Sequence, residues 1–135
     1  MPDPQTDSIG VERTDFVTVA TRDLERAKAF YGEMLGIAAN PMAHPDYPEF
    51  ETGNVTISVI HPESMEMEFA PNPNPIALRV PDVAEARTKL EQAGVEFRGE
   101  TLDTSVCHMA FFSDPDGNAL MLHRRYAPYS DGTTP

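Results

Sequence analysis

The stretch FFSDPDGNALMLHRR, which runs from Phe111 to Arg125, decides how this chain folds. Its middle, Asp114–Asn118, lies between two apolar runs. Pro115 presets φ for the second position of a turn, Gly117 supplies a positive φ, and the Asp and Asn side chains can bond their own backbone. This combination predicts a hairpin turn that joins two strands.

The strand after this turn has two different faces. Leu120 and Leu122 form an apolar face, and they alternate with Ala119, Met121 and His123 on a mixed face. The structural interpretation of these residues is a β-hairpin that closes the domain. The functional question is therefore what the mixed face contacts.

The pattern that leads into the hairpin occurs twice in the chain. In each half an alternating apolar run precedes a helical stripe, and Asp23 and Asp82, 59 positions apart, occupy the N-cap positions. Each stripe ends at a glycine, Gly36 or Gly94, as expected at the C′ position of a helix. The predicted helices cover residues 23–35 and 82–93.

Each half therefore reads β-α-β-β-β, and half a sheet with one helix cannot bury both of its faces. The sequence predicts an α+β fold in which two paired βαβββ modules form an open, cleft-bearing sheet. One face of each module packs on its helix, and the other faces the shared cleft. By residue number we expect a disordered N-terminal tail (1–11), one domain (12–126) made of module one (14–61), a linker (62–74) and module two (75–124), and a C-terminal tail (127–135).

Composition narrows the functional classes. The chain has 135 residues, of which 40% are hydrophobic and 24% charged, which suits a single globular domain. Its formal net charge of −12 argues against nucleic acid as a partner, because the phosphates would be repelled. No apolar run could span a membrane, the start lacks a secretory signal pattern, and the single cysteine, Cys107, cannot form an internal disulfide. We expect a cytoplasmic protein.

Three segments, in this order and spacing, resemble the vicinal oxygen chelate superfamily. They are DFVTVATRDLERAKAFYGEMLGI (15–37), IALRVPDVAEARTKLEQAGV (76–95) and FFSDPDGNALMLHRR (111–125). That superfamily includes glyoxalase I, extradiol dioxygenases, fosfomycin-resistance enzymes and bleomycin-resistance proteins, so the resemblance implies the fold and leaves the chemistry open. It also implies a homodimer, in which the halves can be exchanged between chains.

The metal-ligand positions of that superfamily hold no ordinary metal ligand in this sequence. In metal-dependent members the first strand of each half offers a His or Gln, and the last strand offers a Glu. The resemblance carries these positions to Phe16 and Pro75, to Met121, and to Ser58, or to Ile57 if the two Gly-Asn turns are superimposed without a gap. Divalent metals in such sites use neutral imidazole and carboxylate oxygen. We therefore expect no bound metal and no other cofactor.

A different chemistry remains open through Cys107 and His123. Cys107 and His108 are adjacent, so on a strand they point to opposite faces, and the resemblance places Cys107 inside with Met109 and Phe111. His123 could lie near Cys107 on the neighbouring strand, where such a pair can act as nucleophile and base or as half of a metal site. The alternative is that Cys107 is a small apolar core residue.

The side chains expected to line the cleft are apolar with a few polar groups and one cation, a combination typical of sites for small organic ligands. We predict a metal-independent protein that binds a small organic ligand in this cleft, in the manner of sequestering resistance proteins. The alternative is a glyoxalase-like lyase or isomerase, or a dioxygenase-related enzyme, that uses Cys107, His123 and Arg79 or a non-standard metal site. The predicted ligand-binding residues are Phe16, Thr18, Thr56, Ser58, Arg79, Met109, Phe111, Met121 and His123.

Overall fold

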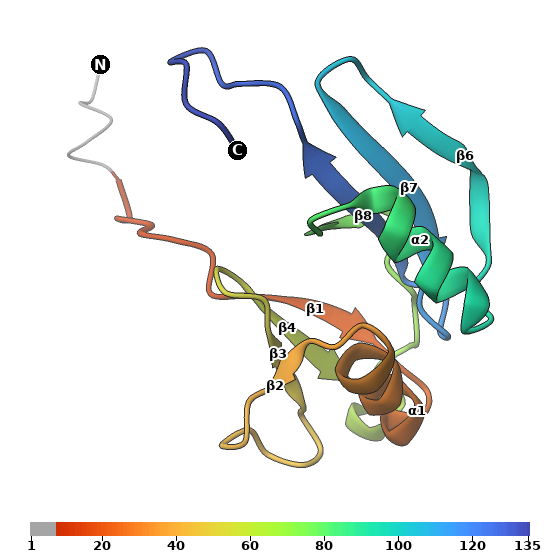
Figure 1. Cartoon of the computed structure of the whole chain (residues 1–135). Helices are drawn as coiled ribbons and strands as arrows, with labels where there is room; N and C mark the ends of the chain where they lie inside the picture. Colours follow the sequence, from red (N-terminus) through yellow and green to blue (C-terminus); the bar gives the residue numbers. More distant parts are fainter. Residues whose placement is uncertain (1–7) are drawn as a thin grey trace.

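The computed structural model describes residues 8–135, which form two modules, each with a sheet of four strands (Figure 1). Module one contains β1 (Phe16–Ala20), α1 (Leu24–Lys28), η1 (Ala29–Met34), β2 (Ala38–Ala39), β3 (Glu49–Glu51) and β4 (Thr56–Ile60). A short helical turn, η2 (Pro62–Met65), begins the linker. Module two contains β5 (Ile76–Arg79), α2 (Val83–Gln92), β6 (Phe97–Asp103), β7 (Cys107–Ser113) and β8 (Ala119–Arg125).

The two sheets have the same topology, which confirms the predicted repeat of βαβββ modules. Their strand orders are β1-β4-β3-β2 and β5-β8-β7-β6, and in each sheet the first strand lies parallel to the last. Thr18 lies opposite Ser58 on β4, and Ala77 lies opposite Met121 on β8. Because Ala77 follows Thr18 by the 59 positions of the repeat, Ser58 and not Ile57 is the equivalent of Met121.

Both helices begin where the sequence predicts. The carboxylate of Asp23 accepts a hydrogen bond from the Arg26 backbone N–H at 3.1 Å, and that of Asp82 accepts one from Glu85 at 3.0 Å. The first helix ends at Gly36, whose φ of 70° lies in the left-handed region that glycine tolerates best.

The first helix is not α-helical along its whole length. After Lys28 it continues as the π-helical segment η1, in which the Leu35 N–H donates to the Phe30 carbonyl at 2.9 Å. The wider turn places the consecutive residues Phe30 and Tyr31 both in the core, where their rings meet edge to face at 5.3 Å. Apolar spacing alone predicted only an ordinary helix here.

One apolar core joins the two modules. Each helix lies across one face of its own sheet (Figure 1), and the strand residues on that face are buried. The buried positions alternate along the strands, as in Val19, Ile57, Phe112, Leu120 and Leu122. Each such side chain contributes about 1.5–3 kcal/mol relative to an exposed one. The opposite face of each sheet carries no helix.

The two terminal segments of the chain lie outside the two sheets. Residues 8–15 have no regular secondary structure, whereas residues 1–7 of the predicted N-terminal tail lie outside the described residues. The C-terminal tail returns to module two, where an Arg124 guanidinium nitrogen donates to the Pro135 carbonyl at 3.3 Å. No helix in the described part of the chain, 8–135, is long and apolar enough to cross a membrane.

Candidate functional site

Five of the predicted ligand-binding residues lie together on the helix-free face of module two. The register places Ala77, Met121 and Phe111 in one row across β5, β8 and β7, and Arg79, His123 and Met109 in the next row. Arg98 of β6 pairs with Phe111, and Arg125 of β8 pairs with Cys107, so both belong to the same face. The module-two face is defined here as Arg79, Arg98, Met109, Phe111, Met121, His123 and Arg125.

The other four predicted residues lie together on the helix-free face of module one. Phe16 pairs with Thr56, and Thr18 pairs with Ser58. Glu51 and Glu49 of β3 lie opposite Thr56 and Ser58 and so share this face. The module-one face is defined here as Phe16, Thr18, Glu49, Glu51, Thr56 and Ser58.

The two faces belong to separate sheets within one chain. β1 and β5 are edge strands, and each pairs on one side only, with β4 and β8 respectively. Phe16, on the module-one face, is 57% exposed, which is unusual for a phenylalanine side chain. Phe16 is therefore open to solvent in the single chain, whereas the central side chains of the module-two face are partly buried.

The side chains at the inherited metal positions do not fit a divalent ion. Phe16 and Pro75 offer no donor atom, Ser58 offers a neutral hydroxyl, and Met121 offers a thioether. Among residues 8–135, no group of three or more His, Cys, Asp or Glu side chains lies close enough together to hold a metal ion. No metal-assisted step can be derived from these residues.

Cys107 and His123 do not form a hydrogen-bonded pair. They lie on the same side of the module-two sheet, but His123 lies opposite Met109, so Cys107 is its diagonal neighbour. Cys107 is buried, and its sulfur lies 3.0 Å from the hydroxyl oxygen of Thr104. This arrangement resembles the small buried core residue more than an activated nucleophile, for which a base lies within hydrogen-bond reach. His108 points to the other face, where its Nε2 lies 3.4 Å from an Asp103 carboxylate oxygen.

The Asp114–Asn118 turn does more than join two strands, because it connects the modules. The carboxylate of Asp114 accepts hydrogen bonds from the Tyr31 hydroxyl at 2.6 Å, from the Asn118 side chain at 2.8 Å, and from the backbone N–H groups of Asp116 and Asn118 at 2.9 Å. Asp114, Asn118 and Tyr31 are all buried. Sequence reasoning assigned the Asp and Asn side chains to local turn bonds and missed the contact with Tyr31.

Asn118 and Asp116 extend the same junction. The Asn118 amide donates to the Ala20 carbonyl of module one at 2.8 Å, and its oxygen accepts from the Asn72 N–H of the linker at 2.8 Å. Asp116 accepts from the Thr21 hydroxyl at 2.6 Å, and it also pairs with Arg26 at 2.8 Å. The turn of module two thus fixes the end of β1 and the start of α1.

Tyr31 is held as a neutral donor in this junction. Burial, reinforced by the nearby Asp114 carboxylate, raises the pKa of the Tyr31 hydroxyl far above its usual range. The phenol therefore keeps its proton at any physiological pH and continues to donate to Asp114.

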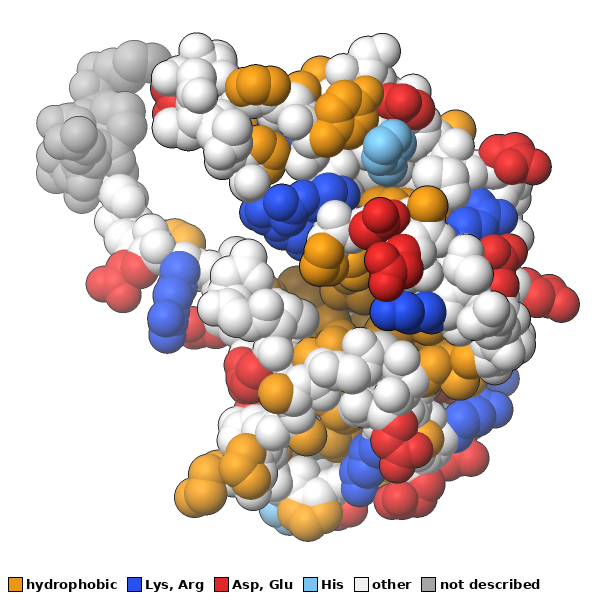
Figure 2. Space-filling view, in the orientation of Figure 1, with side chains coloured by type: hydrophobic (Ala, Val, Ile, Leu, Met, Phe, Trp, Pro, Cys, Tyr) orange, Lys and Arg blue, Asp and Glu red, His pale blue; other side chains and the backbone are white. Residues whose placement is uncertain are grey.

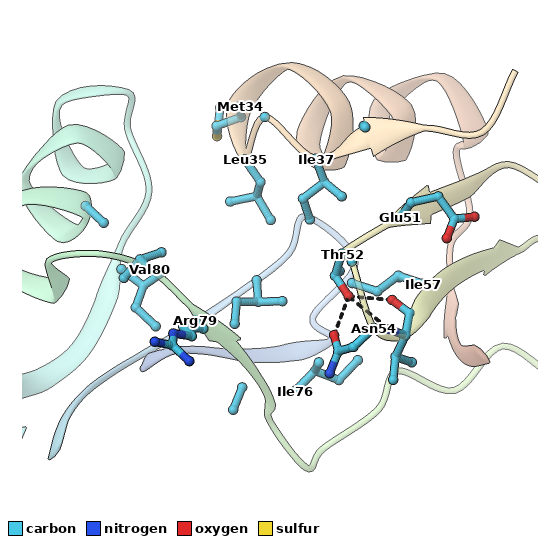
Figure 3. A pocket seen from close by; sticks show the side chains of 18 of the residues that line it. Met34, Leu35, Ile37, Glu51, Thr52, Asn54, Ile57, Ile76, Arg79 and Val80 are labelled. Atoms are coloured by element: carbon cyan, nitrogen blue, oxygen red, sulfur yellow. Dashed lines mark hydrogen bonds between the residues drawn. The ribbon is translucent and has the colours of Figure 1, made fainter. Parts of the chain in front are cut away.

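A large pocket lies between the modules on their helix side, not between the two helix-free faces. Its volume is about 860 Å³, and module one contributes the end of its helix and the β3–β4 turn, while module two contributes β5, α2 and β8. Figure 2 shows a hollow with an apolar floor between the two modules, and Figure 3 shows Leu35 and Ile37 pointing from the helix end toward β5. Of the nine predicted ligand-binding residues, only Arg79 lines this space, which is called the seam pocket below.

Comparison with known proteins agrees with this architecture. A model of the Glyoxalase/Bleomycin resistance protein/Dioxygenase superfamily matches residues 13–122. No curated protein matches the sequence significantly.

Solved structures resemble the chain over most of its length. A glyoxalase family protein from Bacillus anthracis has 25% identity and a TM-score of 0.71 over 87% of this chain and 98% of its own. A member of the same superfamily from Sphaerobacter thermophilus has 23% identity and a TM-score of 0.70 over 84% of this chain and 97% of its own. A lactoylglutathione lyase from Agrobacterium tumefaciens has 16% identity and a TM-score of 0.70 over 84% of this chain and 94% of its own, so its likeness concerns the fold alone.

Proposed function

Since the chain belongs to the Glyoxalase/Bleomycin resistance protein/Dioxygenase superfamily, we propose that it uses this fold to bind a small organic ligand without a metal ion. The ligand lies against the module-one and module-two faces, and sequestration is the simplest role. The observation that carries the proposal is the chemistry of the faces. They combine the exposed Phe16 and partly buried apolar side chains with guanidinium and hydroxyl groups, and they carry no metal-binding set.

We further propose that a second copy of the chain covers the two faces and so encloses the ligand site. The module-one face carries the carboxylates of Glu49 and Glu51. Among the paired strand residues that point to this face there is no Lys or Arg. The module-two face carries the three guanidinium groups of Arg79, Arg98 and Arg125. Among the paired strand residues that point to this face there is no Asp or Glu. None of these three arginines forms an ion pair with a carboxylate of the described chain, residues 8–135, although the protein has 22 acidic residues.

The opposite charges favour a homodimer in which each module-one face meets the module-two face of the partner. Two-fold symmetry then forms the same contact twice, so both faces of both chains are covered. Two ligand sites result, each lined by residues of two chains. Charge complementarity of this kind sets the register and the partner more than the raw affinity.

The ligand-binding proposal is tested by a thermal-shift screen against cellular metabolites, carried out in the presence of a chelator. We expect at least one organic compound to raise the melting temperature under these conditions. The Met121→Arg substitution should weaken binding of this compound at least about tenfold, because the added cation would have to be desolvated against the ligand. Met42→Arg is the matched control, since Met42 is 89% exposed and lies outside both faces. Stabilisation that requires added Zn, Fe, Mn or Ni would refute metal-independent binding.

The dimer proposal is tested by sedimentation at micromolar concentration. We expect a species of twice the 14.9 kDa chain mass. The affinity of the two chains for each other should fall as salt is added, because screening reduces the attraction between the faces. Glu49→Lys with Glu51→Lys should dissociate the dimer, and adding Arg98→Glu should restore part of the association. Glu12→Lys, which changes an exposed residue outside the faces, should have no effect. A monomer at all salt concentrations would contradict the proposal.

A further inference from the structure

We infer that the seam pocket is a second binding site, which accepts an organic carboxylate with an extended apolar body. The site lies on the helix side of the sheets, whereas the proposed function uses the opposite faces. The inference therefore stands mostly on other residues and goes beyond the proposed function. The two share Glu51 of β3 and Arg79, whose strand, β5, lies at the edge of its sheet.

The apolar part of the pocket requires an apolar ligand. Leu35 and Ile37 approach from module one, and Ile76, Leu78 and Leu122 from module two. Apart from Leu122, these side chains are only partly buried, so a ligand between them would remove apolar surface from water. A volume of about 860 Å³ is within the range of sites that enclose a small organic molecule.

The polar groups are separated along the pocket. Arg79 and Val80 lie at one end of β5, and Thr52 and Asn54 of the β3–β4 turn lie on the other side of Ile76 (Figure 3). The Thr52 hydroxyl donates to the Asn54 side-chain oxygen at 3.2 Å, and the Glu51 carboxylate, which lies on the same side of the pocket (Figure 3), would repel an anion. The positive charge open to an anionic ligand is therefore at the Arg79 end.

Arg79 selects an anionic group. Among residues 8–135 its guanidinium has no carboxylate within ion-pair distance and makes no hydrogen bond to a protein group, whereas Lys89, the other cation of the pocket, lies 3.1 Å from Glu85. A guanidinium matches a carboxylate with two parallel hydrogen bonds. One unpaired arginine suits a monoanion, whereas a phosphate dianion would need further cations in a chain of net charge −12.

Three probes test the inference by calorimetric titration of the full-length protein: decanoate, decanol and butyrate. We expect decanoate to bind more tightly than either of the others, because decanol lacks the anion and butyrate lacks most of the apolar body. Arg79→Gln should weaken decanoate binding about tenfold and leave decanol binding unchanged, since one charge-assisted contact is lost. Arg13→Gln, which makes the same change of charge at an exposed position away from the pocket, should leave both unchanged.

A second variant tests the location. Ala86 of α2 lines the pocket, and Ala86→Met should weaken decanoate and decanol together by filling the space. Ala84→Met, an exposed change on the same helix, should leave both affinities unchanged. Equal binding of decanoate and decanol, with no effect of Arg79→Gln, would overturn the carboxylate assignment. No binding of either would overturn the site, and so would loss of binding in Met121→Arg with no effect of Ala86→Met, because the probes would then lie on the module-two face.

Discussion

Replacing Asp114 by Ala is expected to destabilise the protein by about 3–5 kcal/mol, the range for removing one partner of a buried charged network. The substitution removes the acceptor of hydrogen bonds from Tyr31, Asp116 and Asn118, and it leaves these donors in the interior. Because a small domain has only about 5–15 kcal/mol of net stability, the variant should be close to unfolding. Equilibrium urea unfolding measures the difference.

Two comparisons identify the cause. Asp114→Asn keeps an acceptor of the same size but lacks the charge, so we expect a smaller loss than with Ala. Asp131→Ala removes an exposed carboxylate that accepts hydrogen bonds only from the nearby Thr133, and surface changes of this kind usually stay within about 0.5 kcal/mol. If Asp114→Ala unfolds at the same urea concentration as the parent protein, the turn does not hold the modules together as described.

Replacing Phe112 by Ala is expected to cost about 3–5 kcal/mol, whereas the same change at its neighbour Phe111 should cost much less. Phe112 points to the helix side, where it is 1% exposed and packs on Phe97 with ring centroids 5.0 Å apart. Phe111 points to the module-two face and is only partly buried. Urea unfolding of both variants measures the difference between the two faces of one strand.

Phe112→Leu provides the control, because it retains most of the buried apolar volume and should lose considerably less than Phe112→Ala. The comparison also bears on function, since the ligand proposal requires Phe111 to be free of the core. Equal losses of unfolding free energy in the Phe111→Ala and Phe112→Ala variants would mean that both sides of β7 belong to the core of the single chain. The proposal that the ligand binds to the module-two face would then be wrong.

The repeated pattern of the sequence was sufficient to predict the modules. Alternation along a strand and a three-to-four spacing along a helix are local consequences of backbone geometry, so Asp23 and Asp82 could be placed at helix starts without a structure. The same alternation divided β8 correctly between Leu120 and Leu122 in the core and Met121 and His123 on the other face.

The contacts between modules could not be predicted in this way. Asp114 and Tyr31 are 83 positions apart, and nothing in the spacing of either residue indicates the other. The bond between them depends on how two finished modules pack. Periodicity also could not show that the pocket between the modules opens on the helix side, because it assigns residues to faces and does not orient one sheet against another.

The positions that hold metal ligands in other members of the superfamily show how far the fold can be used to assign an activity. The sequence is sufficient to see that Phe16, Ser58, Pro75 and Met121 lack the imidazole and carboxylate groups that hold divalent ions. The strand register then shows that Ser58 and Met121 occupy equivalent places in the two modules. The scaffold of the superfamily is therefore retained with a different set of side chains at its usual centre of chemistry, and fold alone does not assign the activity.

Native mass spectrometry of protein purified without added metal tests the central claim most directly, because one spectrum reports assembly, metal and ligand together. We predict a species of twice the 14.9 kDa chain mass that carries no metal ion and gains the mass of one organic ligand per chain when a compound from the screen is added. A chain that carries one tightly held Zn, Fe, Mn or Ni ion, and binds the compound only in that form, would contradict metal-independent binding.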